Sequence, residues 1–203
     1  MTIDKKVLVA VTGASGAIYA ERLLQELTTR VSRVYLVMTD AAKQVVQHEL
    51  SPQKQSLIGQ ILAGQLSDSQ KSVIRYFSVD DLFAPVASGS SVPTDMIVVP
   101  CSMGSLARIA TGQSTNLLER SADVVLKQKK NLIICPRETP LSQIHLENML
   151  SLSKLGVQIL PLMPAFYQKA KTVEDLVDFL VGRMLEGLGL EHQLYVPWNS
   201  RMR

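Results

Sequence analysis

The chain has few of the residues on which several common chemistries depend. Its 203 residues include two cysteines and three histidines, and aromatic side chains make up 5%. The cysteines close two separate apolar runs, which is neither a disulfide framework nor a zinc-binding spacing and fits a reducing cytoplasm. The histidines lie far apart, so we expect no metal site. Scarce aromatic side chains argue against stacking on nucleic-acid bases.

The sequence also lacks a strong charge of one sign and a long apolar run. Its net charge is only +3, with scattered basic residues, which argues against nucleic-acid binding. No apolar run approaches the roughly 20 residues that span a bilayer, and the first residues lack a signal peptide's features. We therefore expect a cytoplasmic protein with no membrane span. Its length predicts one domain over residues 1–203.

Short apolar runs alternate with segments of helical periodicity. The runs cover residues 7–12, 34–38, 73–77, 96–100, 132–135 and 157–160. The helical segments cover residues 17–29, 40–50, 53–63, 116–128 and 145–155, and a last helix starts after Thr172. Strands that are apolar on both faces are typical of sheets covered by helices on both sides. The alternation predicts an α/β fold with a doubly wound, mostly parallel, six-stranded sheet.

Gly13, Ala14, Ser15 and Gly16 form a small-residue turn between the first run and the first helix. A strand, a glycine-rich turn and a helix N-terminus together make an anion site, because free N–H groups point at the ligand. The spacing matches neither a dinucleotide fingerprint nor a Walker loop. We predict a phosphate-bearing ligand here, although an ordinary tight turn explains these residues equally well.

The residues that follow the other strands are also small or carry hydroxyl groups. In an open parallel sheet the ligand binds beyond the carboxyl ends of the strands, so these residues are considered together. They comprise residues 13–15, 39–40, 87–91, 101–106, 136–140 and 161–167. Because no acidic or histidine cluster occurs among them, we expect no metal ion at this edge.

Six segments identify a family resemblance. They are GASGAIYA (13–20), SGS (88–90), PCSMGSLARIATG (100–112), PRETPL (136–141), HLENM (145–149) and PAFY (164–167). In this order and spacing they closely resemble the UbiX flavin prenyltransferases. The resemblance implies a flavodoxin-like Rossmann domain that binds FMN and assembles into a homo-dodecamer with active sites at subunit contacts. The apolar tail of residues 194–198 also favours buried subunit contacts.

The resemblance further implies an activity. It implies transfer of a dimethylallyl group from dimethylallyl monophosphate to N5 and C6 of reduced FMN, without a metal ion. The product would be prenylated FMN, which a UbiD-type decarboxylase receives. Such a transfer breaks a C–O bond beside an anionic leaving group, which guanidinium, hydroxyl and N–H donors stabilise. A closed apolar pocket keeps water from the carbocation-like fragment, and a carboxylate or the released phosphate accepts the C6 proton.

Site residues follow from the resemblance by position. The FMN-binding residues are Gly13, Ala14, Ser15, Thr39, Ser102, Met103, Gly104, Ser105 and Arg137. The residues that bind the prenyl phosphate are Ser88, Gly89, Ser90, Arg120, Lys127, Tyr167 and Arg183. The residues of the transfer chemistry are Glu49, Glu138 and Ser15. By pattern alone, Glu49, Arg120 and Lys127 are solvated surface residues, and Glu138 is a partner of Arg137 or part of a helix turn.

Two other functions fit part of the sequence. A flavin-dependent cysteine decarboxylase has a similar Rossmann domain and first turn, but it carries a PASANT-like loop and a catalytic histidine. Here the loop reads PCSMGSLA, and only His48 lies near the second or third strand. A non-catalytic FMN carrier needs no second phosphate site, so Ser90, Lys127, Tyr167 and Arg183 count against it.

Overall fold

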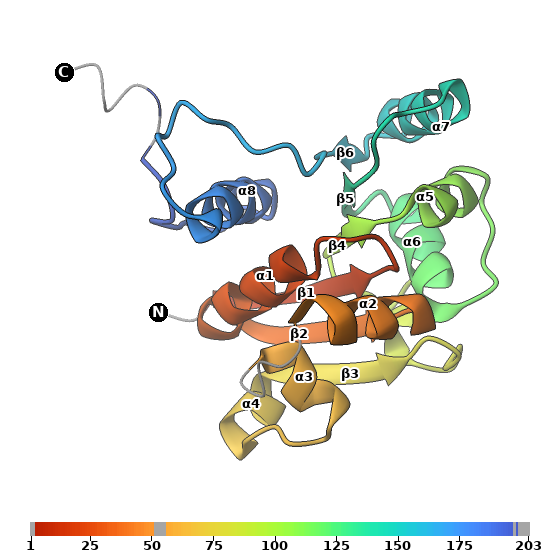
Figure 1. The fold of residues 1–203 in the computed structure, drawn as a ribbon. Helices are drawn as coiled ribbons and strands as arrows, with labels where there is room; N and C mark the ends of the chain where they lie inside the picture. The colour runs from red at the N-terminus through yellow and green to blue at the C-terminus, as the bar shows by residue number, and fades with distance from the viewer. Residues whose placement is uncertain (1–2, 51–55, 197, 199–203) are drawn as a thin grey trace.

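The computed structural model describes residues 3–50, 56–196 and 198 (Figure 1). Its strands form one sheet in the order β3-β2-β1-β4-β5-β6, and every neighbouring pair is parallel. The strands are β1 (Ile3–Val11), β2 (Val31–Met38), β3 (Ile74–Ser78), β4 (Asp95–Cys101), β5 (Asn131–Pro136) and β6 (Gln158–Ile159). This order is that of the doubly wound Rossmann sheet, so the predicted α/β Rossmann fold with a parallel six-stranded sheet is confirmed.

Helices cover both faces of the sheet (Figure 1). The α-helices are α1 (Ala17–Arg30), α2 (Asp40–Leu50), α3 (Leu57–Leu62), α4 (Asp68–Val73), α5 (Met103–Ala110), α6 (Leu117–Lys127), α7 (Gln143–Lys154) and α8 (Val173–Gly187). Successive side chains of a strand point to opposite faces. Val7 and Val9 therefore pack in the core with α1, α2, α3 and α8, whereas Leu8 and Ala10 pack in the core with α5 and α6. Polar substitutions in either core should destabilise the fold, because a buried polar group without a hydrogen-bond partner costs free energy.

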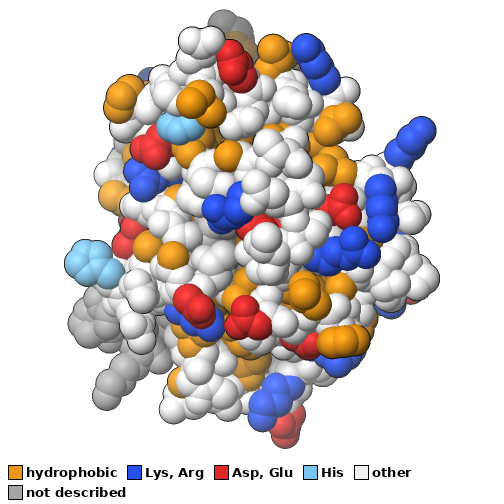
Figure 2. Space-filling model, turned by 90° about the vertical axis from the view of Figure 1, so that its right-hand side faces the viewer, with side chains coloured by type: hydrophobic (Ala, Val, Ile, Leu, Met, Phe, Trp, Pro, Cys, Tyr) orange, Lys and Arg blue, Asp and Glu red, His pale blue; other side chains and the backbone are white. Residues whose placement is uncertain are grey.

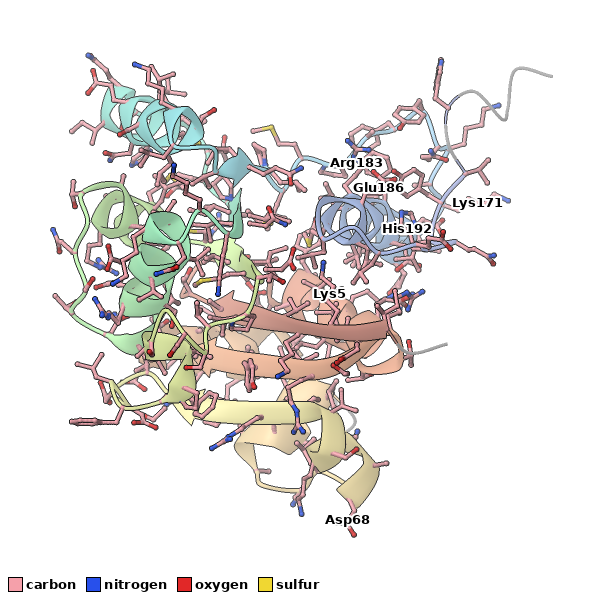
Figure 3. All side chains as sticks on the ribbon, turned by 180° about the vertical axis from the view of Figure 1, so that it is seen from behind. Lys5, Asp68, Lys171, Arg183, Glu186 and His192 are labelled. Atoms are coloured by element: carbon pink, nitrogen blue, oxygen red, sulfur yellow. The ribbon has the colours of Figure 1, made fainter. Side chains whose placement is uncertain are left out.

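The last helix, α8, forms as its apolar stripe predicts. Thr172 and Asp175 make a capping box at its start. At its other end the ammonium group of Lys5 donates to the carbonyl of Leu188 at 2.5 Å and pairs with Asp95 at 3.0 Å. Lys5 lies near the start of β1 and Asp95 is the first residue of β4, so the C-terminal end of α8 lies at the amino ends of the strands (Figure 3).

The structure differs from the prediction in several short elements. Helix α5 was expected to be a loop, because Gly104 and Ser105 are weak helix formers. The cap of Ser102 and the burial of Leu106 and Ile109 outweigh that preference. Helix α4 and the 3-10 helix η1 (Pro85–Ala87) were also missed. The helix expected at residues 53–63 is α3, and its first expected residues, 53–55, lie outside the described residues.

The two cysteines are free and buried, as their spacing predicts. Cys101 packs in the core beside α5 and α6, and Cys135 packs in the core on the other face of the sheet. Burial raises the pKa of the Cys101 thiol to about 12 and also raises that of Cys135. Neither thiol is therefore an activated nucleophile. Within the described residues, no helix is long and apolar enough to cross a membrane.

Candidate active site

Hydrogen bonds join three loops at the carboxyl edge of the sheet, which is the edge at which the parallel strands end. Figure 2 shows the molecule from this side. The hydroxyl of Thr12, at the end of β1, donates to the carbonyl of Pro100 and accepts the N–H of Ser102, both at 2.8 Å. Arg137, after β5, donates from Nε to the carbonyl of Ser15 at 3.2 Å. The structure therefore brings the first turn, the start of α5 and Arg137 together.

Local structure explains why glycine occupies positions 13 and 16 in the first turn. A Cβ on Gly13 would lie 2.5 Å from the Cβ of Ala41, so the turn packs directly against α2. Gly16 has a φ of +113°, in the left-handed region that favours glycine. Close packing and backbone conformation thus account for both glycines, and a ligand is not needed to explain them.

The N-terminus of α1 binds a carboxylate of the same chain. The side chain of Glu49, in the last turn of α2, accepts the backbone N–H groups of Gly16 at 2.9 Å and Ala17 at 2.8 Å. Partial burial raises the pKa of Glu49, but hydrogen bonds from Ser15 and these N–H groups, with the charge of Arg137, outweigh it and hold the pKa below its usual value. The anion at this helix N-terminus is thus Glu49, not the ligand phosphate that the sequence predicts there.

The N-terminus of α5 is a second polar turn. Ser102 caps it, with Oγ accepting the N–H of Ser105 at 3.3 Å. Ser105 is only 2% exposed, and its Oγ accepts from Ser102 Oγ at 3.1 Å and from Arg108 Nη2 at 3.3 Å. The N–H groups of Met103 and Gly104 have no acceptor among the residues that the structure describes. This turn therefore keeps N–H donors for an anionic ligand.

Thr39 and Glu138 also lie at the carboxyl edge. Thr39 follows β2 and caps α2, because its hydroxyl accepts the N–H of Ala42 at 3.1 Å. Glu138 is exposed, and its carboxylate accepts the N–H of Thr139 at 3.0 Å. Within the described part of the chain no ion pair joins Glu138 to Arg137, so the alternative in which they are partners is wrong. Glu138 is available to a ligand.

The hydroxyl-rich segment of residues 88–90 lies along α6. Arg120 donates from Nε to the carbonyl of Ala87 at 3.3 Å. A Cβ on Gly89 would lie 2.7 Å from the side-chain amide of Gln128, the C-cap of α6. The exposed Lys127 stands just before that cap. The segment thus extends toward the C-terminal end of α6, near the start of β5, and does not join the loops at the carboxyl edge.

Tyr167 belongs to an aromatic cluster beside α8. Its ring meets the ring of Phe179 edge-on, with centroids 5.8 Å apart, and that of Trp198 edge-on at 4.9 Å. The phenol side chain is 41% exposed, so part of it remains accessible to a ligand. Packing on Phe179 fixes Tyr167 relative to α8, the helix that carries Arg183.

Arg183 is held by polar partners on the same side of α8 (Figure 3). It pairs with Glu186, whose carboxylate also accepts the hydroxyl of Tyr195 and lies 3.3 Å from Nε2 of His192. A hydrogen bond to Tyr195 is the main cause that raises the pKa of Arg183. A Cβ on Gly182 would lie 2.6 Å from Tyr195 and 2.7 Å from His192, so this glycine lets both rings approach the helix.

A single copy of the chain separates the residues that were predicted to bind the prenyl phosphate. Arg120 and segment 88–90 lie with α6 on one face of the sheet, whereas Arg183 lies on α8, which covers the other face. Arg183 is also near the C-terminal end of α8, which Lys5 holds at the amino ends of the strands. One copy therefore does not bring these residues together, and a shared site at subunit contacts stays a prediction.

Sequence reasoning missed several residues that shape the carboxyl edge. Thr12 was counted as part of a strand, and Arg108 was given no role of its own. Glu119 was not singled out, although its carboxylate is 1% exposed and pairs with Arg108. The spacing of Asn116 and Glu119 gives a signal for that site, because a capping residue followed three positions later by Glu marks a helix start. The structure describes no group of three or more His, Cys, Asp or Glu side chains that would hold a metal ion.

Comparison with known proteins identifies the class of protein to which this chain belongs. The sequence model of the Flavoprotein family matches residues 1–185, so the chain is a flavoprotein-family domain. The flavin prenyltransferase UbiX of Halalkalibacterium halodurans is 51% identical over 201 residues, which cover 98% of this chain and 97% of that protein. The chain belongs to the UbiX flavin prenyltransferase family.

Similar solved structures support the assignment to this family. AnUbiX (PadA1), in complex with FMN and dimethylallyl pyrophosphate, has a TM-score of 0.85 and 38% identity, with 97% of this chain and 98% of that chain covered. The dodecameric FMN-dependent UbiX-like decarboxylase from Escherichia coli O157:H7 has a TM-score of 0.84 and 42% identity, with coverage of 95% and 98%. The family resemblance found in the sequence is thus confirmed.

Proposed function

We propose that this protein is a flavin prenyltransferase that binds FMN at the carboxyl edge and transfers a dimethylallyl group to it from dimethylallyl monophosphate. The observation that carries the proposal is the junction of three loops at this edge, through Thr12 and Arg137. Ligands of doubly wound sheets bind at this edge. The 51% identity to a flavin prenyltransferase over nearly the whole chain supports the choice of reaction.

The groups at the junction fit FMN. The N–H groups of Met103 and Gly104, the hydroxyl of Ser105 and the guanidinium of Arg137 supply donors for phosphate and carbonyl oxygens. Gly13, Ala14, Ser15 and Thr39 complete the FMN-binding set at the same edge. AnUbiX, 38% identical, was solved with FMN bound. We propose that no metal ion takes part, because cationic side chains supply the charge that the leaving group requires.

The reaction forms two bonds to reduced FMN. The C–O bond of the prenyl phosphate breaks, the phosphate leaves with the electron pair, and the prenyl carbon bonds to N5, which gives up its proton. The bond to C6 then forms as the prenyl C=C bond takes up a proton and its tertiary carbon bonds to C6. C6 gives up its ring proton in this step, for which Glu49, Glu138 or the released phosphate is the acceptor. Ser15 contributes a hydroxyl beside Glu49. We propose that the product, prenylated FMN, passes to a UbiD-type decarboxylase in the cytoplasm.

We propose that neighbouring copies together complete the prenyl-phosphate site. Tyr167 and Arg183 lie on one face of the protomer, and Ser88, Gly89, Ser90, Arg120 and Lys127 lie on the other face, so contact between copies is the way to bring both groups to one phosphate. Large apolar side chains are exposed on the protomer, including Phe83 at 100%, Phe166 at 75% and Trp198 at 52%. The Escherichia coli structure is dodecameric. We therefore propose a dodecamer.

One incubation tests the reaction, and light scattering tests the assembly. Anaerobic incubation with reduced FMN and dimethylallyl monophosphate should give an extracted flavin with the mass of a prenyl adduct. A decarboxylase or an FMN carrier would return FMN of unchanged mass. Light scattering at micromolar concentration should give the mass of twelve chains, and a monomer would contradict the shared site.

A further inference from the structure

The pair of Arg108 and Glu119 lies directly behind the polar turn at the start of α5. The carboxylate of Glu119 is buried and accepts from four donors: Arg108 Nε, the N–H of Thr115 at 3.0 Å, the hydroxyl of Thr115, and the side-chain amide of Asn116 at 3.0 Å. Each carboxylate oxygen has two of these donors. Glu119 is therefore fixed, and it fixes one side of the Arg108 guanidinium in turn.

The other side of the guanidinium reaches the first turn of α5. Nη2 of Arg108 donates to Oγ of Ser105 at 3.3 Å, and Nη1 lies 3.4 Å from where Gly104 would carry a Cβ. Arg108 thus extends back along its own helix toward the N-terminal N–H groups. A planar guanidinium can bind two partners at once in this way, whereas a lysine ammonium is a single point charge on a flexible stem.

The contact determines the direction of the Ser105 hydroxyl. A hydroxyl has one hydrogen to donate and two lone pairs to accept with. Ser105 accepts from Arg108 and from Ser102 Oγ, so both lone pairs are used and its hydrogen remains to be donated. No residue in the described ranges accepts it. Serine hydroxyls in helices commonly donate to a backbone carbonyl one turn earlier. The contacts with Arg108 and Ser102 hold the Ser105 hydroxyl away from that hydrogen bond.

We propose that Arg108 and Glu119 are positioning residues for the flavin site: Glu119 holds Arg108, and Arg108 orients the Ser105 hydroxyl as a donor to FMN. This inference depends on the proposed FMN site at the start of α5. A clamp between α5 and α6 alone would affect only the stability of the fold. A role through Ser105 affects FMN affinity as well.

The test is a double-mutant cycle on FMN dissociation constants, measured by quenching of flavin fluorescence with the full chain. R108M and S105A should each weaken FMN binding roughly fivefold to tenfold, the effect of one hydrogen bond. The double variant should bind FMN no more weakly than S105A, because Arg108 acts through Ser105. R75M, which removes the same charge from an exposed position on β3, should leave the affinity unchanged.

Arg108→Lys separates positioning from folding. Its ammonium group still pairs with Glu119, so the melting temperature should stay close to that of the wild type, but FMN binding should weaken as in R108M. FMN affinity of R108K equal to that of the wild type, or additive effects of R108M and S105A, would overturn the inference. A wild-type protein that binds no FMN would instead overturn the proposed function.

Discussion

The carboxylate of Glu49 accepts the backbone N–H of Ala17 at 2.8 Å and so closes the N-terminus of α1. The contact joins the last turn of α2 to the first turn of α1 across 32 residues of sequence. A negative charge at this position complements the helix dipole. Because the same carboxylate lies beside Ser15 and Arg137, one contact serves both the stability of the fold and the electrostatics of the carboxyl edge.

Glu49→Gln should reduce stability in a pH-dependent way. The folded pKa of Glu49 is depressed, so its stabilisation is present above the unfolded pKa of about 4.3 and is lost as the pH falls through the lower folded value. We expect a loss of about 0.5–1 kcal/mol at neutral pH, which shrinks toward pH 3. Urea denaturation at both pH values measures it, with the exposed Glu147→Gln as control. A constant difference between Glu49→Gln and wild type would contradict the expectation.

Ser15→Ala combined with Arg137→Ala should weaken FMN binding without added metal. Arg137 donates to the carbonyl of Ser15, so both residues belong to one loop junction. Loss of a charged contact to the ligand costs on the order of 1.5–3 kcal/mol. Titration of the double variant with FMN measures the effect. An unchanged dissociation constant would remove both residues from the FMN site.

Arg183→Ala and Tyr167→Phe should retain FMN and lose prenyl transfer. Arg183 lies on α8, near the end that Lys5 holds at the amino ends of the strands, and the ring of Tyr167 packs on Phe179 of the same helix. Arg183 should have the larger effect, because a charged donor stabilises the leaving phosphate more than a neutral phenol does. Single-turnover formation of prenylated FMN, with flavin occupancy measured in parallel, tests this. Loss of FMN in Arg183→Ala would move Arg183 to the flavin site, and transfer at the wild-type rate would favour an FMN carrier.

Glu138→Gln should keep FMN bound and slow product formation. The carboxylate is exposed and accepts only a local backbone N–H among the described residues, so the fold does not depend on its charge. The amide keeps the size of the side chain and removes a proton acceptor. Single-turnover kinetics of this variant under anaerobic conditions provide the measurement. An undiminished rate would leave Glu49 or the released phosphate as the proton acceptor.

Gly182→Ala should destabilise the packing of the C-terminal segment on α8. The added Cβ would lie 2.6 Å from Tyr195 and 2.7 Å from His192, closer than any ordinary contact. Overpacking of this kind costs about 1–3 kcal/mol. Thermal denaturation should show a lower melting temperature than that of the wild type. Gly64→Ala is a control with open space around the new Cβ, although its positive φ adds backbone strain of its own.

The six strands, their parallel arrangement and most of the helices could be predicted from the sequence, whereas the strand order could not. The spacing of apolar residues is a local property of the sequence. It therefore sufficed to predict strands β1, β2 and β4 and the apolar stripe of α8. The family segments are also short stretches of sequence, so they could be recognised without the structure. Helix α5 was missed because the Ser102 cap and the burial of its apolar residues outweigh the low helix propensity of its first turn.

The side-chain partners at the site could not be predicted from the sequence. Glu49 at α1 and Glu119 beneath Arg108 depend on contacts between residues of separate helices, which periodicity does not encode. The separation of Arg183 from Arg120 follows from the placement of α8 and α6 on opposite faces of the sheet. A site made from such residues is a property of packing, because side-chain partners are chosen by three-dimensional proximity and not by order in the chain.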